Sequence, residues 1–338
     1  MIEIVFLGTS ASAPSIRRGL PAHVVMFEDR RFLVDCGEGT QRQLLKSGLG
    51  FRRLETILLT HAHLDHILGL AGFLSTVMRW EILPRVAIYG RRGTIERVKD
   101  LIYRVVLRGV RPSIEISFHV IEPGLLFEDE KLSVYAFPVT HRGGDSLGYL
   151  FREKPRRPFL VEKAEALGIP PGPERRRLVQ GEPVTLPDGR VVRPDDVLGP
   201  PVEGASLALV GDAGRVDDLV EAVRGVGALV IEATYLEADR DLARRHDHLT
   251  AAEAAGLARA AGVGHLILTH VSRRYREREI RQEAMALFPR VWVARDFDRY
   301  RILKDGQLEV ERAEVHEIEE ERDVLAESER AGAGHGGL

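Results

Sequence analysis

Cysteine is nearly absent from this sequence, which contains only Cys36 among its 338 residues. A single cysteine excludes an internal disulfide framework and suits a reducing compartment, so we expect a cytoplasmic protein. Cys36 follows the apolar run 32–34, and we expect it to be a small buried residue at the end of a strand.

Long apolar runs are also lacking. No stretch approaches the roughly 20 apolar residues that a membrane-spanning helix needs. Residues 1–6 carry no basic region and run into a glycine turn, which predicts a first strand and not a signal peptide. We therefore expect no membrane partner.

Acidic and basic residues are nearly balanced along the chain, except near its end, where acidic residues predominate. The net charge is −3, but residues 309–330 hold ten Asp or Glu and only three Arg, which leaves residues 1–308 with a small positive charge. This division predicts one catalytic domain over 1–308 and an acidic, disordered tail over 309–338. The mildly basic body permits a polyanionic substrate.

What the sequence does contain is a dense group of metal-binding side chains. The apolar run 56–59 reads as a buried strand, and His61, His63, Asp65 and His66 follow it within seven positions. Imidazole and carboxylate are the usual ligands of zinc and similar metals. His61 and His63 can point at one ion, while Asp65 and His66 are offset and can reach a second.

Other polar residues also stand at the ends of apolar strands. His141 is the natural third ligand of the first ion, Asp212 could bridge two ions, and His270 is the candidate last ligand. Asp35 either orients a ligand histidine from behind or serves as a simple turn residue. Three further histidines in strand-like runs are expected to be structural: His23, His119 and His265.

Composition changes between residues 152 and 204, where ten of the 17 prolines fall. Residues 152–177 carry eight basic and four acidic side chains, and residues 186–190 have the composition of a hairpin turn. No independent second domain follows this stretch. We therefore expect a protruding arm over about 152–182.

The His-x-His-x-Asp-His pattern after an apolar strand resembles the signature of the metallo-β-lactamase superfamily of dinuclear metal hydrolases. The chain repeats strands, a ligand turn and helices in each half, which fits two sheets packed face to face with helices outside. The resemblance implies an α/β fold, the four-layer αββα sandwich.

Several short motifs resemble the ribonuclease Z family more closely. They are residues 6–9, 35–41, 231–234, 248–250 and 268–275, with the proline-glycine stretch 169–173 resembling the flexible arm of that family. The resemblance implies an endoribonuclease that removes the 3′ trailer from tRNA precursors, leaving a 3′-hydroxyl on the tRNA and a 5′-phosphate on the trailer.

The resemblance also implies a ligand set for two zinc ions per subunit. His61, His63 and His141 would hold one ion, Asp65, His66 and His270 the other, with Asp212 bridging them. Two departures from the family pattern stand out: Ala213 replaces a common threonine, and residues 71–80 match the usual loop near the tRNA 3′ end only loosely.

Hydrolysis of a phosphodiester needs an activated water and a protonated leaving group. Paired divalent ions lower the pKa of water and stabilise both oxygens of the displacement. Asp65 is the candidate acceptor of the water proton. His248 would donate a proton to the leaving ribose 3′-oxygen, with Glu232 fixing its tautomer.

The basic arm would bind tRNA through its phosphates, without reading sequence. Arg175, Arg176 and Arg177 are the expected contacts, together with Gly172 and Pro173. The resemblance also implies a homodimer, in which the arm of one subunit binds the tRNA that is cleaved at the site of the other.

Two other functions compete with this interpretation. A small-molecule ester or thioester hydrolase of the same superfamily would use the same ligands, but it would have no use for a basic arm. A non-catalytic RNA-binding protein with a structural metal site would not need the spare histidine, His248, beside a complete ligand set.

Overall fold

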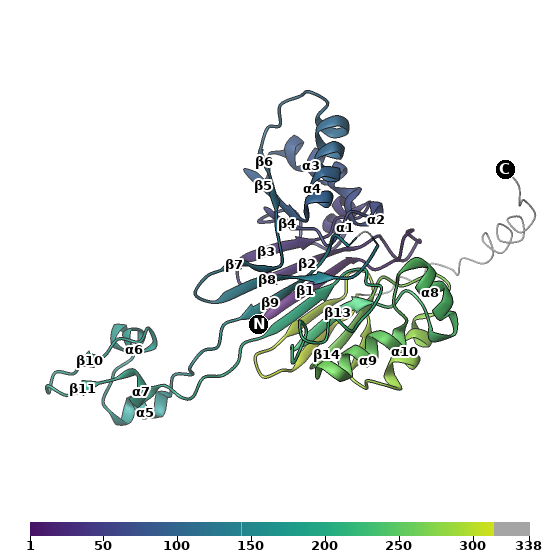
Figure 1. Ribbon diagram of the computed structural model, residues 1–338. Helices are drawn as coiled ribbons and strands as arrows, with labels where there is room; N and C mark the ends of the chain where they lie inside the picture. The colour runs from purple at the N-terminus through teal and green to yellow at the C-terminus, as the bar shows by residue number, and fades with distance from the viewer. Residues whose placement is uncertain (143, 314–338) are drawn as a thin grey trace, which may run out of the picture.

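Two β-sheets lie face to face in the computed structural model, which describes residues 1–142 and 144–313, and helices cover both outer faces (Figure 1). The first sheet has eight strands in the order β17-β16-β1-β2-β3-β4-β5-β6. The second has seven in the order β15-β14-β13-β12-β9-β8-β7. This is the four-layer αββα sandwich that the resemblance implied.

The strands of the two sheets are bounded as follows. The eight-stranded sheet contains β1 (Ile2–Gly8), β2 (Ala22–Phe27), β3 (Arg30–Val34), β4 (Thr56–Leu58), β5 (Arg85–Gly90), β6 (Glu115–Val120), β16 (Arg299–Ile302) and β17 (Leu308–Glu311). The seven-stranded sheet contains β7 (Gly124–Glu128), β8 (Leu132–Val139), β9 (Ser146–Glu153), β12 (Ser206–Val210), β13 (Ala228–Glu232), β14 (His265–Thr269) and β15 (Val291–Val293).

Helices flank the sheets in two groups. Along the eight-stranded sheet run α1 (Thr40–Lys46), α2 (Leu64–Ile67), α3 (Gly69–Trp80), α4 (Arg92–Asp100) and the π-helix η1 (Leu101–Leu107). Beside the seven-stranded sheet lie the 3-10 helix η2 (Glu237–Asp239), α8 (Arg240–His246), α9 (Ala251–Ala261) and α10 (Glu277–Met285).

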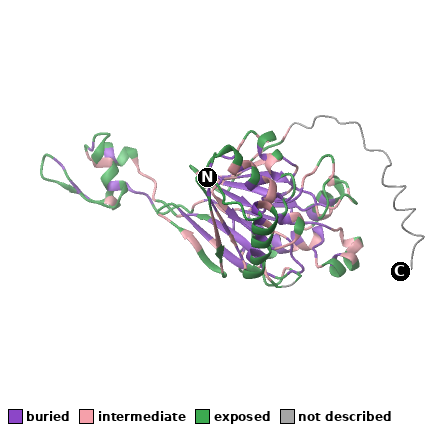
Figure 2. Ribbon diagram, turned by 90° about the horizontal axis from the view of Figure 1, so that it is seen from above, coloured by how far each residue is buried: buried purple, intermediate pink, exposed green. Residues whose placement is uncertain are grey.

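Alternation of side chains along the strands builds the core between the sheets. Ile4 and Phe6 of β1 face the second sheet and pack in one cluster with Val134 and Leu209, whereas Val5 of the same strand joins the cluster under the helices. Successive strand residues point to opposite faces, so both faces of each sheet are apolar and buried. Figure 2 shows the sheets as the buried centre of the molecule.

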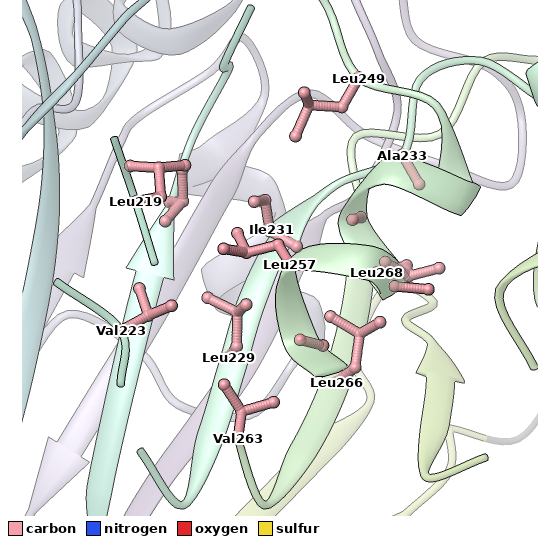
Figure 3. Close-up of a cluster of buried hydrophobic side chains, with 14 of the residues drawn as sticks. Leu219, Val223, Leu229, Ile231, Ala233, Leu249, Leu257, Val263, Leu266 and Leu268 are labelled. Carbon is pink, nitrogen blue, oxygen red and sulfur yellow. The ribbon is translucent and has the colours of Figure 1, made fainter. Parts of the chain in front are cut away.

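The outer helices bury one apolar face each. In α3 the residues Leu70, Phe73, Leu74 and Val77 recur with helical spacing and are all buried. On the opposite side, Leu257 of α9 lies among side chains of β13 and β14, including Leu229 and Leu266 (Figure 3).

The strands that deliver the polar residues of interest lie where the sequence predicts them. Directly after His63 the chain enters the short helix α2, and α3 follows it. Helix α9 begins after Thr250, which caps it through a reciprocal pair of hydrogen bonds with Glu253.

The expected boundary at residue 308 was placed too early. Strand β17 pairs antiparallel with β16, and Leu308 and Val310 pack against the core between the sheets while Glu311 pairs with Arg301. Alternating acidic and apolar residues therefore form an edge strand here. The remainder of the predicted acidic tail, residues 314–338, lies outside the described residues.

The predicted arm is longer than 152–182. It projects from the sandwich and contains α5 (Val161–Ala166), α6 (Pro173–Val179), the hairpin β10 (Val184–Thr185) and β11 (Val191–Val192), and α7 (Pro194–Val197) (Figure 1). The reason is a small apolar core of its own, in which Ile169 and Leu178 pack with Val184, Val192 and Val197. The hairpin and α7 complete this core, so the arm returns to the body only before β12.

Among the helices of residues 1–142 and 144–313, none combines the length and the apolar character that crossing a membrane would require.

Candidate metal centre

The polar residues singled out from the sequence meet at one edge of the sandwich. Strands β3 and β4 are parallel to each other, and β12, β13 and β14 form a second parallel set. Both sets direct their carboxyl ends to this edge, where ligand sites of α/β sheets characteristically lie. Short turns after the strands then carry the histidines and carboxylates.

One group of ligand atoms comes from His61, His63 and His141 together with Asp212. Asp212 Oδ2 lies 3.6 Å from His61 Nε2, 4.0 Å from His63 Nδ1 and 3.8 Å from His141 Nε2. His63 Nδ1 and His141 Nε2 are 3.4 Å apart. Three imidazoles and one carboxylate oxygen thus surround a common point.

A second group comes from Asp65, His66 and His270. Asp65 Oδ2 is 3.7 Å from His66 Nε2 and 3.5 Å from His270 Nε2. Asp212 Oδ1 lies 3.3 Å from His66 Nε2 and 3.2 Å from His270 Nε2. The two oxygens of Asp212 therefore face different groups, as a bridging ligand requires.

Hydrogen bonds behind the histidines select the tautomer that a metal needs. His66 Nδ1 lies 2.8 Å from Asp35 Oδ2, and His141 Nδ1 lies 2.7 Å from the carbonyl oxygen of Asp247. Both partners accept, so each Nδ1 carries the proton and each Nε2 keeps a lone pair for the centre. Of the two roles left open for Asp35, the structure shows the orienting one.

Two threonines do the same through a relay. Thr60 Oγ1 donates to Asp35 and lies 3.0 Å from His61 Nδ1. Thr234 Oγ1 donates to Glu232 and lies 2.9 Å from His270 Nδ1. Because each hydroxyl has one proton and gives it to a carboxylate, it accepts from the histidine, whose Nε2 again faces inward with a lone pair.

The inward atoms fit a metal ion because the protein leaves them without other partners. Four of them are buried and make no hydrogen bond with any described residue: His61 Nε2, His66 Nε2, His270 Nε2 and Asp212 Oδ1. Buried polar atoms without partners are costly, and a cation held at this point would satisfy all four.

Electrostatics favour positive charge at the same point. Although burial opposes it, the carboxylates of Asp212 and Asp35 raise the pKa of His66 well above its usual value. Burial also opposes ionisation of Asp212, yet His270 and His66 hold its pKa well below the usual range. By contrast, burial lowers the pKa of His61, which keeps that imidazole neutral and able to ligate.

His248 stands beside both groups, and the structure brings Glu232 against it. His248 Nδ1 lies 2.9 Å from Glu232 Oε1 and 4.0 Å from Asp212 Oδ2. Burial lowers the pKa of His248, but the charge and hydrogen bond of Glu232 outweigh it and raise that pKa to about 9. A histidine that keeps both protons at neutral pH is suited to proton donation.

Glu232 also accepts hydrogen bonds from two backbone N–H groups at the centre. Its Oε1 accepts the backbone N–H of Ala213, next to Asp212, at 2.8 Å, and its Oε2 accepts the N–H of Leu249, next to His248, at 3.2 Å. Glu232 is fully buried, so one carboxylate orients the turn that carries Asp212 as well as His248.

The histidines expected to be structural belong to neither ligand group, although His23 lines the same small cavity as His66 and His270. His23 is buried, and burial lowers its pKa to about 3. His119 stacks on Tyr89, and His265 bonds the carbonyl oxygen of Gly306. Cys36 is buried as expected, and burial raises the pKa of its thiol to about 12, which leaves it unreactive.

The expected tRNA contacts of the arm differ in their surroundings. Gly172 has a φ of 151°, which favours glycine, and Pro173 occupies the first turn of α6. Arg176 is exposed, and Arg177 pairs with Glu182 at the surface. Arg175 instead donates to the carbonyl of Ile169, so its side chain belongs to the arm's own packing.

Sequence reasoning missed three residues that support the ligands: Thr60, Thr234 and Asp247. Thr60 immediately precedes His61, and Thr234 is two positions from Glu232, so adjacency to a named residue was the available signal. Asp247 likewise directly precedes His248, but its contact with His141 is through its backbone carbonyl, which side-chain chemistry does not indicate; Asp247 has a φ of 61°.

Curated relatives share most of this chain. It is 46% identical to the ribonuclease Z of Bradyrhizobium diazoefficiens over 298 residues, which cover 88% of this chain and 99% of that protein. It is 47% identical to the ribonuclease Z of Bradyrhizobium sp. strain ORS 278, with the same coverage of both chains. The chain belongs to the ribonuclease Z family. As the resemblance predicted, it is a metal-dependent hydrolase of the metallo-β-lactamase fold.

Solved structures agree with membership of the ribonuclease Z family. The short form of human tRNase Z matches with a TM-score of 0.62 and 27% identity, covering 88% of this chain and 98% of that one. YhfI of Bacillus subtilis, a metallo-β-lactamase fold protein, matches with the same TM-score at 17% identity, which shows the fold alone. A family model described as anti-Pycsar protein Apyc1 matches residues 2–154, less than half of the chain.

Proposed function

We infer that this protein is an endoribonuclease that removes the 3′ trailer from tRNA precursors. The observation that carries the inference is the identity of 46% to a ribonuclease Z over 88% of this chain. The expected products are a tRNA with a 3′-hydroxyl and a trailer with a 5′-phosphate. A small-molecule ester or thioester hydrolase is not favoured, because it would leave the projecting arm without a role.

The proposed cofactor is a pair of zinc ions. His61, His63 and His141 would hold one ion and Asp65, His66 and His270 the other, with one oxygen of Asp212 toward each. Histidine and carboxylate ligands suit zinc, and the lone pairs that the ligand histidines direct inward support this choice. Paired zinc ions, when bound, supply an activated water at neutral pH and stabilise the charge on a phosphodiester.

The chain's own residues supply the proton transfers. Asp65 places its Oδ2 among His66 and His270, where it is suited to accept the proton of the attacking water. His248 keeps its Nδ1 proton against Glu232, so the proton on Nε2 is the one available to the leaving 3′-oxygen. With a separate base and acid, the attacking water can lose its proton while the leaving 3′-oxygen gains one.

The arm is proposed to bind the tRNA body in a homodimer. Topology supports an arrangement in which each arm serves the other subunit. The arm leaves the body after β9, where Arg152 pairs with Ser206 at the start of β12, whereas Asp212 follows the far end of β12. The arm therefore projects from the edge opposite its own metal ligands. A cytoplasmic location is proposed from the lone, buried Cys36.

The test is cleavage of a precursor tRNA with a 3′ trailer by wild type, His248→Ala and His246→Ala, with the product end mapped. His246 is an exposed histidine two positions away and serves as the matched control. We expect a cut after the discriminator base, a loss of about 10²- to 10⁴-fold in kcat for His248→Ala with zinc retained, and little change for His246→Ala. Zinc-loaded wild type that ignores the precursor but hydrolyses small esters would contradict the proposal.

A further inference from the structure

The loop between β1 and β2 touches the metal centre through its backbone. Within this loop, which we define as Thr9–Gly19, the N–H of Ser12 donates to Asp65 Oδ2 at 3.1 Å. That oxygen is the same atom that faces His66 and His270. Ser12 has a φ of 55°, an uncommon conformation for a residue other than glycine, which the surrounding contacts must maintain.

Backbone hydrogen bonds fasten this loop beside the last ligand. The N–H of Val271, the residue after His270, donates to the carbonyl of Thr9 at 2.9 Å, and the N–H of Ala11 donates to the carbonyl of Val271 at 3.1 Å. The N–H of Ser10 donates to the carbonyl of Gly19 at 2.9 Å and closes the neck of the loop. The position of the Ser12 amide thus depends on how this neck is held.

A buried carboxylate outside the ligand set holds both sides of the neck. Asp296 Oδ1 accepts the hydroxyl of Thr9 at 2.7 Å, and Asp296 Oδ2 accepts the N–H of Gly19 at 2.6 Å. Gln43 Nε2 donates to the same Oδ2 at 2.8 Å. Asp296 is 8% exposed and follows β15, far along the chain from the loop that it binds.

A second side chain reinforces the anchor from within the loop. Arg18 donates to Thr9 Oγ1 and to the carbonyl of Ala294, each at 2.6 Å, and pairs with Glu277 at 3.5 Å. Burying these charges is costly: burial raises the pKa of Asp296 to about 6 and lowers that of Arg18. Buried polar anchors of this kind are expected where one geometry must be kept.

We propose that Asp296 is a positioning residue for Asp65, acting by clamping Thr9 and Gly19 so that the Ser12 N–H stays against the Asp65 carboxylate. The proposal rests on the proposed function, because it assigns Asp65 a part in phosphodiester cleavage. It predicts that loosening the clamp lowers kcat but leaves the zinc content and the affinity for the precursor unchanged. A small displacement of a reacting group is sufficient to slow an enzyme strongly.

The test compares Asp296→Asn with Asp298→Asn. Asp298 is the matched control, because it is fully buried in the same segment but accepts the N–H groups of Arg295 and Ala313 and pairs with Arg312, away from the loop. The readouts are kcat and KM on a trailer-bearing precursor, kcat on bis(p-nitrophenyl) phosphate, bound zinc, and the temperature of unfolding. Asp296→Asn is expected to lose about tenfold in kcat on both substrates with KM within about twofold.

A double variant and a rescue separate positioning from simple loss of stability. In an Asp65→Asn background, Asp296→Asn is expected to change kcat less than about twofold, since both changes act on one group. Should Asp296→Asn fail to fold, Thr9 variants replace it. Thr9→Val, which lacks the hydroxyl that binds Asp296, is expected to lower kcat, whereas Thr9→Ser, which keeps the hydroxyl, is expected to retain the kcat of wild type. Equal kcat losses for the Asp296 and Asp298 variants at equal folded fraction, or full additivity with Asp65→Asn, would overturn the proposal.

The two substrates keep this result distinct from the proposed function. If wild type hydrolyses bis(p-nitrophenyl) phosphate but leaves the precursor intact, the tRNA substrate is wrong, and the Asp296 comparison is still decided on the small diester. If wild type cleaves the precursor and the Asp296 and Asp298 variants behave alike, the positioning role alone is rejected.

Discussion

Single side chains behind the metal ligands determine whether the ligands can bind. Four histidines direct their Nδ1 atoms to acceptors: Asp35 for His66, Asp247 for His141, Thr60 for His61 and Thr234 for His270. Each acceptor leaves the inward Nε2 with a lone pair. The ligand set is therefore prepared by residues that would never touch the metal.

At this scale we predict that Thr234→Val weakens zinc binding about 10- to 100-fold, because His270 loses its acceptor while the shape of the side chain is kept. The measurement is competition for zinc against a chromophoric chelator. Thr94→Val is the matched control, since Thr94 is buried and its hydroxyl makes no hydrogen bond among the described residues. Unchanged zinc affinity in Thr234→Val would show that the relay through Thr234 does not orient His270.

At the scale of elements, strand direction and turns deliver the functional groups. Parallel strands β12, β13 and β14 end in Asp212, Glu232 and His270 at or just past their carboxyl ends, so their order in the sheet places these groups side by side. In the arm, the functional side chains are positioned differently. Helix α6 packs on a small apolar core of the arm, and Arg176 lies on its exposed face.

For the arm we predict that Arg176→Ala weakens precursor binding and reduces the salt dependence of binding by about one phosphate contact, a decrease of about 0.9 in the logarithmic slope. Hydrolysis of bis(p-nitrophenyl) phosphate should not change, because the arm joins the body at the end of β12 opposite the one that Asp212 follows. Filter binding across a range of salt concentrations measures the effect. Gln180→Ala, at the end of the same helix, is the control and should bind like wild type; equal losses in both variants would contradict a role for the Arg176 charge.

At the scale of the whole molecule, the metal centre joins the two sheets. His61, His63, Asp65 and His66 follow a strand of the eight-stranded sheet, whereas His141, Asp212 and His270 follow strands of the seven-stranded sheet. Any ion held by both sets would bind the folded state and not the unfolded chain, and so would stabilise the packing of one sheet on the other.

We therefore predict that chelation of zinc lowers the temperature of unfolding, by an amount equivalent to about 2.7 kcal/mol when zinc is present at 100 times its dissociation constant. Calorimetry with and without a chelator measures the shift. The control is Asp212→Asn, which lacks the carboxylate common to both ligand groups and should respond much less to the chelator. An identical response of wild type and this variant would mean that the stabilising ion is bound elsewhere.

Much of the centre could be predicted because its chemistry is local in the sequence. His61, His63, Asp65 and His66 lie within six consecutive positions, and strand-end positions marked His141, Asp212 and His270. The arm boundary and the end of the domain were misplaced for a physical reason. Val184, Val192, Leu308 and Val310 lie in short strands. Their burial depends on partners elsewhere in the chain, so the local pattern does not reveal it.

By itself the sequence determined the fold class, the ligand types and their division into two groups, because residue chemistry and strand periodicity are written along the chain. Only the tertiary structure decided the tautomers of four ligand histidines, the two-sided placement of Asp212 and the clamp of Asp296 on the Thr9–Gly19 loop. Those features depend on hydrogen bonds between residues far apart in sequence, such as Thr9 and Asp296. Their geometry exists only after the two sheets have packed.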